Sequence, residues 1–189
     1  MDEIVKAALR KWPNVPSCHG WLALDARGHW YMRDDRIQAA GPFPHVKGSR
    51  IEHHRLLEFI HRNYAADEAG SWYFQNGPQR VYVDLEAAPF VWRVDTRPEG
   101  AAPGSAGWPV HAQTGQRAHV LSSWLDESGR LFLDTDLGFG LVHSLDTGIA
   151  AAAVEAGDWQ PAVLPFEAMP LRFAYQLRPR PAAAPNNSG

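Results

Sequence analysis

Residues 124–140, WLDESGRLFLDTDLGFG, carry the pattern that decides the fold class of this chain. Two β-prone apolar runs lie on either side of the tetrapeptide DESG. In this tetrapeptide Asp126 can bond to its own backbone, and Gly129 tolerates the left-handed conformation of a turn. The stretch therefore predicts a β-hairpin. Together with the neighbouring segments 117–126 and 139–146 it predicts a meander of antiparallel strands.

A similar pattern occurs near the front of the chain, in WLALDARGHWYMRD (21–34). Two β-prone runs are again joined by a turn that contains a glycine, Gly28. Further along, Asn76-Gly77 is a strong hairpin signal between two more runs. The strands predicted in this region are 71–75, 80–86 and 89–95.

Apolar spacing predicts three helices, over 2–12, 49–64 and 147–157. Ser49 and Glu52 have the spacing of a capping box, so we expect the second helix to begin there. Near the end of the chain, PLRFAYQL (170–177) alternates between apolar and polar residues. This alternation predicts an antiparallel strand with one face in water.

These elements together predict an α+β fold, with mostly antiparallel sheet in two small lobes and two or three helices. The N-terminal α+β lobe is expected to cover 1–96, and the C-terminal antiparallel lobe, with its short helix, 110–178. Residues 97–109 are rich in Pro, Gly and Ala, which indicates a loop or linker. Residues 179–189 are expected to be a disordered tail.

Composition excludes several classes of function. The formal net charge is −3 and the pI is about 6.3, which argues against a nucleic-acid partner. Cys18 is the only cysteine, so one chain can form neither a disulfide nor a cysteine-based metal cluster. No stretch approaches the ~20 apolar residues of a membrane helix, and the acidic start does not resemble a signal peptide. We therefore expect a cytoplasmic protein without a membrane partner.

Two acidic residues of the opening stretch, Asp134 and Asp136, would point to one face of a strand, where they could share a metal ion. The segment DTDLG also resembles the start of a calcium loop. Such a loop needs further oxygen ligands at its fifth and twelfth positions, which are Gly138 and Leu145 here. We favour the interpretation that these carboxylates end a strand and begin a turn in water.

A second candidate metal site is His54, Glu58 and His61, which fall at i, i+4 and i+7 on one face of the predicted second helix. Two imidazoles and a carboxylate can bind a divalent ion. The known zinc-helix spacing H-E-x-x-H is absent, so we favour a solvated helix face.

The aromatic residues suggest a binding surface. Eight tryptophans are many for 189 residues, and the hairpin over 21–36 places aromatic residues beside arginines. A flat ring next to a charged group suits a sugar, a nucleotide or a peptide. The candidate ligand-binding residues are Trp30, Tyr31, Arg33, Arg36, Asp134 and Asp136.

Four segments give the chain a wider resemblance: WLALDARGHWYMRDDRI, VYVDLEAAPFVWRV, WLDESGRLFLDTDLGFGLV and LPFEAMPLRFAYQL. In their order they resemble a short betaproteobacterial family of unknown function. The chain is also distantly similar to a second uncharacterised proteobacterial family, through residues 86–90, 135–138 and 171–173. The resemblance implies an α+β, two-lobed fold and brings no activity and no catalytic residue.

The sequence thus predicts a non-enzymatic cytoplasmic module that binds a small ligand or a partner protein, and no cofactor is expected. It contains no P-loop, no G-x-S-x-G and no G-x-G-x-x-G after a strand. The alternative is a metal-dependent enzyme that uses the His/Glu or the paired-Asp site. A third possibility is a structural subunit whose exposed strand at 170–177 pairs with another chain, for example in a homodimer.

Overall fold

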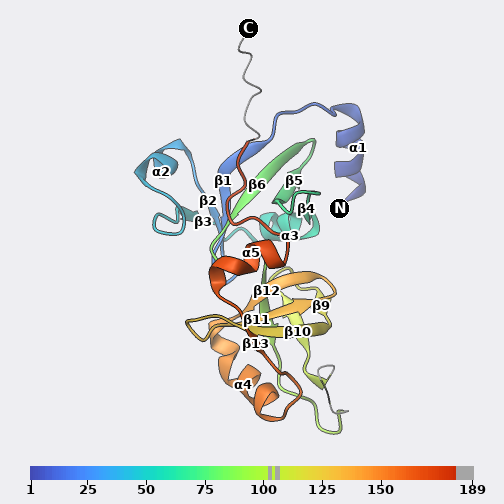
Figure 1. Cartoon of the computed structure of the whole chain (residues 1–189). Coiled ribbons are helices and arrows are strands. Elements are labelled where there is room, and N and C mark those ends of the chain that lie inside the picture. Colours follow the sequence, from blue (N-terminus) through green and yellow to red (C-terminus); the bar gives the residue numbers. More distant parts are fainter. Residues whose placement is uncertain (102–103, 105–106, 182–189) are drawn as a thin grey trace.

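The computed structural model describes residues 1–101, 104 and 107–181, and it contains two β-sheets in two lobes (Figure 1). The upper lobe in the figure holds a six-stranded sheet with strand order β3-β2-β1-β6-β5-β4. Its strands are β1 (Cys18–Leu24), β2 (Trp30–Met32), β3 (Ser49–Arg50), β4 (Tyr64–Ala66), β5 (Trp72–Asn76) and β6 (Gln79–Leu85). Its helices are α1 (Glu3–Lys11), α2 (Asp35–Ala40) and α3 (His54–Arg62).

The lower lobe holds a seven-stranded sheet with strand order β13-β10-β11-β12-β7-β8-β9. Its strands are β7 (Phe90–Val94), β8 (Val110–Ala112), β9 (Arg117–Ala118), β10 (Val120–Leu125), β11 (Leu131–Thr135), β12 (Gly138–Val142) and β13 (Ala162–Val163). Helical segments follow β12 and β13: η2 (Ser144–Asp146), α4 (Thr147–Glu155), η3 (Phe166–Ala168) and α5 (Met169–Arg172).

All three predicted hairpin turns are present, and two of them use the same chemistry. In the β1–β2 turn the Asp25 carboxylate accepts the backbone N–H groups of Arg27 and His29, at 2.9 Å each. In the β10–β11 turn Asp126 accepts the N–H groups of Ser128 and Arg130, at 3.0 and 2.8 Å. Each aspartate thus satisfies backbone donors that the tight turn leaves without partners. The stretch 124–140 is therefore a hairpin whose first acidic residue is structural.

The α+β class and the two lobes are confirmed, but the sheets are mixed and not purely antiparallel. Strand β1 pairs in parallel with β6, β7 with β12, and β10 with β13. These parallel partners lie far apart in the sequence. Hairpin signals report only strands that are neighbours along the chain, so they could not predict these pairs.

The predicted capping box is wrong. Ser49 belongs to β3, where it pairs with Met32, and α3 begins at His54. The Nδ1 atom of His53 accepts the N–H of Leu56 at 3.3 Å and so takes the place of the cap. Pairing with β2 satisfies the backbone of residues 49–50, which removes them from the helix.

The predicted strand at 170–177 is also wrong. Residues 169–172 form α5, and the following backbone passes through Ala174 at a φ of 50°. Leu171, expected on the covered face, is 91% exposed. Phe173 and Tyr175 nevertheless reach the core, where Phe173 stacks on Phe139 with ring centroids 3.8 Å apart. The alternation therefore predicted which aromatic side chains are covered, but not the backbone form.

One hydrophobic cluster connects the two lobes. It joins Leu22, Val83 and Leu85 of the first sheet to Phe132 and Phe139 of the second. Strand β7, inside the 1–96 range expected for the N-terminal lobe, pairs in the second sheet. The division at 97–109 stays a prediction. Residues 102–103 and 105–106 of that loop, and 182–189 of the expected tail, lie outside the described residues.

Candidate functional site

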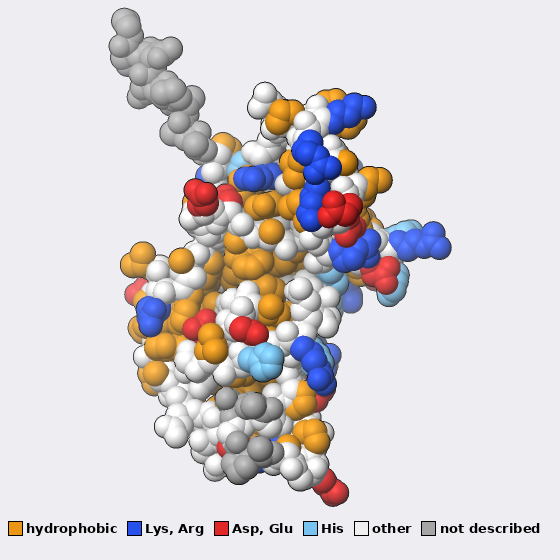
Figure 2. All heavy atoms as spheres, turned by 90° about the vertical axis from the view of Figure 1, so that its right-hand side faces the viewer, with side chains coloured by type: hydrophobic (Ala, Val, Ile, Leu, Met, Phe, Trp, Pro, Cys, Tyr) orange, Lys and Arg blue, Asp and Glu red, His pale blue; other side chains and the backbone are white. Residues whose placement is uncertain are grey.

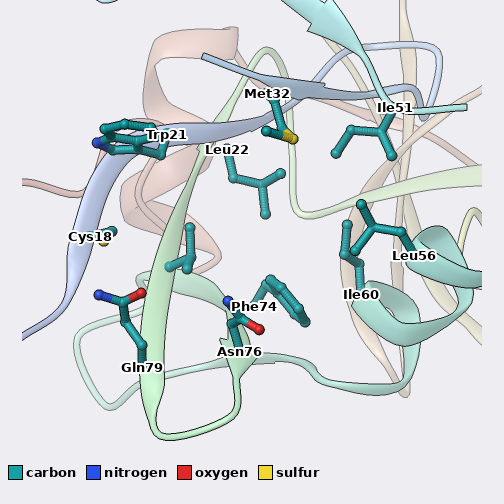
Figure 3. A pocket seen from close by; sticks show the side chains of 11 residues that line it. Cys18, Trp21, Leu22, Met32, Ile51, Leu56, Ile60, Phe74, Asn76 and Gln79 are labelled. Atoms are coloured by element: carbon teal, nitrogen blue, oxygen red, sulfur yellow. The ribbon is translucent and has the colours of Figure 1, made fainter. Parts of the chain in front are cut away.

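An apolar hollow of about 270 Å³ lies between α3 and the face of the first sheet that α3 covers. Figure 3 shows its lining, with Trp21, Leu22 and Met32 on the strand side and Leu56 and Ile60 on the helix side. The lining residues are Cys18, Trp21, Leu22, Met32, Ile51, Leu56, Ile60, Phe74, Asn76, Gln79 and Val81. We call this hollow the α3 groove.

An irregular strand shapes one wall of the α3 groove. Along β1, Cys18 lies opposite Val81 and Leu22 lies opposite Val83. An advance of four residues along β1 therefore corresponds to an advance of only two residues along β6. The extra residues include Gly20, whose φ of 78° suits glycine. This bulge places Trp21 beside the groove, although strict alternation with Leu22 would turn its side chain away.

The rim of the α3 groove exposes large apolar side chains. Trp21 is 41% exposed and Met32 is 52% exposed, whereas Leu22 and Ile60 behind them are buried. On the face shown in Figure 2, hydrophobic side chains also gather across the middle of the molecule, below a group of Lys and Arg side chains. The first sheet thus has apolar side chains that are left exposed to solvent.

The polar groups of the α3 groove are neutral. Asn76 and Gln79 lie at the β5–β6 turn, close together at one end of the hollow in Figure 3. Gln79 donates a hydrogen bond to the carbonyl oxygen of Pro16 at 3.1 Å, which fixes its amide. Among the described residues that line the groove, none carries a formal charge.

Behind the groove, Trp30 and His61 tie β2 to α3. Trp30 is 1% exposed, and its indole N–H donates to Nε2 of His61 at 3.0 Å. Its ring and the Tyr64 ring are perpendicular, with centroids 5.2 Å apart. Burial lowers the pKa of His61, opposed in part by Glu58, so its neutral, accepting form is favoured. Trp30, a predicted ligand residue, therefore supports the wall of the hollow from within the core.

The other predicted residues of the first lobe do not line the α3 groove. The Tyr31 hydroxyl donates to Asp25 at 3.1 Å. Arg33 is buried and donates to the carbonyl oxygens of Val46 and Gly41, at 3.2 and 2.7 Å. Arg36 is exposed on α2.

Asp134 and Asp136 lie in the second lobe, apart from the four residues of the hairpin. Asp136 accepts the backbone N–H of His119 at 2.8 Å and contacts its ring at 3.0 Å. Asp134 is half-buried on β11, and burial raises its pKa. The structure therefore does not bring the six predicted ligand residues together.

The structure does not place the three alternative metal residues around a common point. His54 and Glu58 lie 3.5 Å apart on the exposed side of α3, with the His54 side chain 84% exposed. His61 uses Nε2 to accept from Trp30. Within the described ranges, no three His, Cys, Asp or Glu side chains are placed to share a metal ion.

Sequence reasoning missed Trp21, Met32 and Phe74 as site residues, although two signals were available. The alternation of the hairpin placed Met32 on the same face as Trp30. The apolar stripe of the second helix had to cover some strand face, and Leu56 and Ile60 cover this one. Only the bulge at Gly20, which turns Trp21 toward the groove, had no sequence signal.

A family model, DUF2944, described as "Protein of unknown function (DUF2946)", matches residues 1–181. The chain belongs to the DUF2944 family. This confirms its resemblance to a family without assigned function, whereas a betaproteobacterial origin stays a prediction. No curated protein matches this DUF2944 member.

Two solved structures of DUF1285 family proteins are similar to the DUF2944 chain, each at 13% identity and a TM-score of 0.46. The protein from Shewanella baltica OS155 matches over 72% of this chain and 91% of its own. The protein from Silicibacter pomeroyi DSS-3 matches over 78% and 82%. In the described part of the chain, no helix has the length and apolarity needed to cross a membrane.

Proposed function

We propose that this protein is a binding module for a small, uncharged and largely apolar molecule that occupies the α3 groove. One observation carries the proposal: an apolar hollow with uncharged walls has Trp21 and Met32 exposed at its rim. Ligand sites in proteins are typically concave and apolar, with a few polar groups that orient the ligand.

The exposed rim supplies the driving force for binding. Apolar surface removed from water contributes about 25 cal/mol per Å². A ligand that covers roughly 100 Å² of Trp21, Met32 and their neighbours would therefore gain about 2.5 kcal/mol from that surface alone. The buried side chains behind the rim are already packed, so little reorganisation opposes binding.

The polar end of the groove selects the type of ligand. The amides of Asn76 and Gln79 offer both donors and acceptors, which suit a hydroxyl or an amide group. A charged group placed there would lose its hydration without meeting an opposite charge. The ligand is therefore neutral where it enters the groove.

The lining residues support binding more than catalysis. Cys18 is the one nucleophilic side chain among them, and none of the others is a histidine, carboxylate or lysine that could serve as its base. A binding role also agrees with the non-enzymatic function predicted from the sequence.

Titration with N-phenyl-1-naphthylamine, an uncharged probe whose fluorescence rises in apolar sites, tests this proposal. We expect saturable binding that Trp21→Ala weakens about fivefold to tenfold, since about 1 kcal/mol of ring contact is lost. Trp12→Ala is the control, because Trp12 is 51% exposed but does not line the groove. Absence of saturable binding, or equal effects of the two substitutions, would contradict the proposal.

A further inference from the structure

A second hollow, of about 260 Å³, lies against β6 on the side of Asp84 and Arg33, and its chemistry is opposite to that of the α3 groove. Its walls come from β1, β6, the residue that follows β2, the segment around α2 and the C-terminal segment. They include Gly20, Arg33, Gln38, Phe43, Asp84, Arg178 and Arg180. We call it the arginine pocket. It shares no lining residue with the α3 groove, so a ligand in this pocket would be independent of the proposed function.

Asp84 is the central feature of the arginine pocket. It is 3% exposed, and its carboxylate oxygens lie 3.6 Å from Nη1 of Arg33 and 3.9 Å from Nη1 of Arg180. Both distances are longer than a hydrogen bond. No residue in the described ranges donates a hydrogen bond to this carboxylate. Buried carboxylates are normally hydrogen-bonded, because their desolvation is costly. Asp84 is thus a buried carboxylate that faces the cavity and accepts no hydrogen bond from the described residues.

Arg33 is held in place without using Asp84. Its Nε and Nη2 atoms donate to the carbonyl oxygens of Val46 and Gly41, and its guanidinium lies 5.9 Å from the ring centre of Phe43. These contacts leave Nη1 directed toward Asp84. A donor and an acceptor therefore lie side by side in the pocket, 3.6 Å apart. A hydroxyl group can satisfy both, because it donates one hydrogen bond and accepts another.

Arg178 and Arg180 add positive charge at the open side of the pocket. Both belong to the C-terminal segment, and the Arg180 side chain is 62% exposed. That segment is fixed on the first lobe, because the Tyr175 hydroxyl donates to the carbonyl of Ala87 at 3.0 Å and the Leu177 carbonyl accepts from Leu85 at 2.8 Å. Three guanidinium groups thus face one carboxylate, which leaves an excess of positive charge for an anion.

We propose that the arginine pocket binds a small hydroxylated anion of the sugar-phosphate class. A hydroxyl of the sugar would donate to Asp84 and accept from Arg33, and the phosphate oxygens would accept from Arg178 and Arg180. Guanidinium groups match the geometry of phosphate oxygens well. A metal ion or an ammonium group is disfavoured, because three arginines repel it. Free phosphate could use the arginines but brings no sugar hydroxyl to bridge Asp84 and Arg33.

Isothermal titration of the full chain with ribose 5-phosphate, ribose and inorganic phosphate tests the proposal. Ribose 5-phosphate should bind at least tenfold more tightly than either of the other two. Asp84→Asn should lower the ratio of ribose 5-phosphate affinity to phosphate affinity about tenfold, since the sugar loses its charged acceptor. Arg180→Gln should weaken the binding of both ribose 5-phosphate and inorganic phosphate.

The control is Arg55→Gln, which removes an exposed arginine from α3 on the other side of the sheet and should leave all affinities unchanged. Ribose 5-phosphate that binds no more tightly than phosphate, or an unchanged affinity ratio in Asp84→Asn, would overturn the proposal. Circular dichroism checks that each variant is folded. If Asp84→Asn does not fold, the comparison of the three probes and the exposed Arg180→Gln variant still decide the outcome.

Discussion

The indole N–H of Trp30 donates to Nε2 of His61 across 3.0 Å, and this bond joins β2 to α3 beneath the α3 groove. The bond requires that Nε2 carry no proton. Burial lowers the pKa of His61 below the 6.5 of a free imidazole. The wall of the groove is therefore linked to the protonation of one histidine.

Acidification should destabilise the protein partly through His61. Its folded pKa lies below its unfolded pKa, so its contribution to stability is present above pH 6.5 and is lost as the pH falls through the folded pKa. His61→Gln keeps an oxygen that can accept from Trp30 but does not titrate. Urea unfolding at pH 7.5 and pH 5.5 should show a smaller loss of stability in this variant than in the wild type.

Burial also lowers the pKa values of His19 and His143. The His61→Gln variant will therefore retain part of the pH dependence of stability that the wild type shows. His54→Gln is the control, because the His54 side chain is 84% exposed. Identical pH dependence in His61→Gln and His54→Gln would show that the Trp30 contact is not linked to protonation.

A charge placed in the α3 groove should weaken binding of a neutral ligand. Asn76→Asp keeps the size of the side chain and adds one negative charge to a wall without charges. We expect N-phenyl-1-naphthylamine to bind about threefold to tenfold more weakly, a cost of roughly 1 kcal/mol. Asn14→Asp makes the same change in an exposed loop and should have no effect. Equal affinities of both variants for the probe would locate its site elsewhere.

Removing the charge of Asp84 should not destabilise the fold at neutral pH. Burial raises the pKa of Asp84 above the usual 3.8, in opposition to the arginines around it. A raised carboxyl pKa means that its contribution is most favourable below pH 3.8 and is lost as the pH rises through the folded pKa. The test compares the unfolding free energies of Asp84→Asn and the wild type from pH 3.5 to pH 7. As the pH rises, the variant should therefore become more stable relative to the wild type.

The opposite outcome for Asp84 has a definite meaning. A variant that becomes progressively less stable than the wild type toward pH 7 would show that the Asp84–Arg33 pair stabilises the fold. The pair would then be a structural ion pair rather than a site that retains an unpaired carboxylate for a ligand.

The C-terminal segment should depend on a glycine that lies far from it in sequence. Gly70 has a φ of 76°, and a Cβ added there would meet the carbonyl oxygen of Ala174. Gly70→Ala therefore combines backbone strain with a clash, and we expect a loss of roughly 2–4 kcal/mol in chemical denaturation.

Gly77→Ala is the control for this experiment. Gly77 also has a positive φ, of 58°, but its Cβ would meet nothing within 4 Å. Backbone strain alone should cost about 1–2 kcal/mol there. If the two variants lose equal stability, the C-terminal segment does not pack on Gly70 as the structure places it.

Part of the α3 groove was predictable, and part was not. Alternation along the first hairpin placed Trp30 and Met32 on one face, and both lie on that side of the sheet. The sequence could not distinguish their environments. Trp30 is covered by His61 and Tyr64, which come from other elements, whereas Met32 is left at the rim.

The sequence alone determined the features that depend on a few neighbouring residues. The hairpin turns at Asp25 and Asp126 and the apolar stripe of α3 follow from backbone preferences and periodicity within a short window. The tertiary structure alone decided the parallel pairing of β1 with β6 and the meeting of Asp84 with Arg180, since both require segments that are distant in the chain. Such contacts are selected by burial and strand pairing over the whole fold, and local periodicity holds no information about the partner.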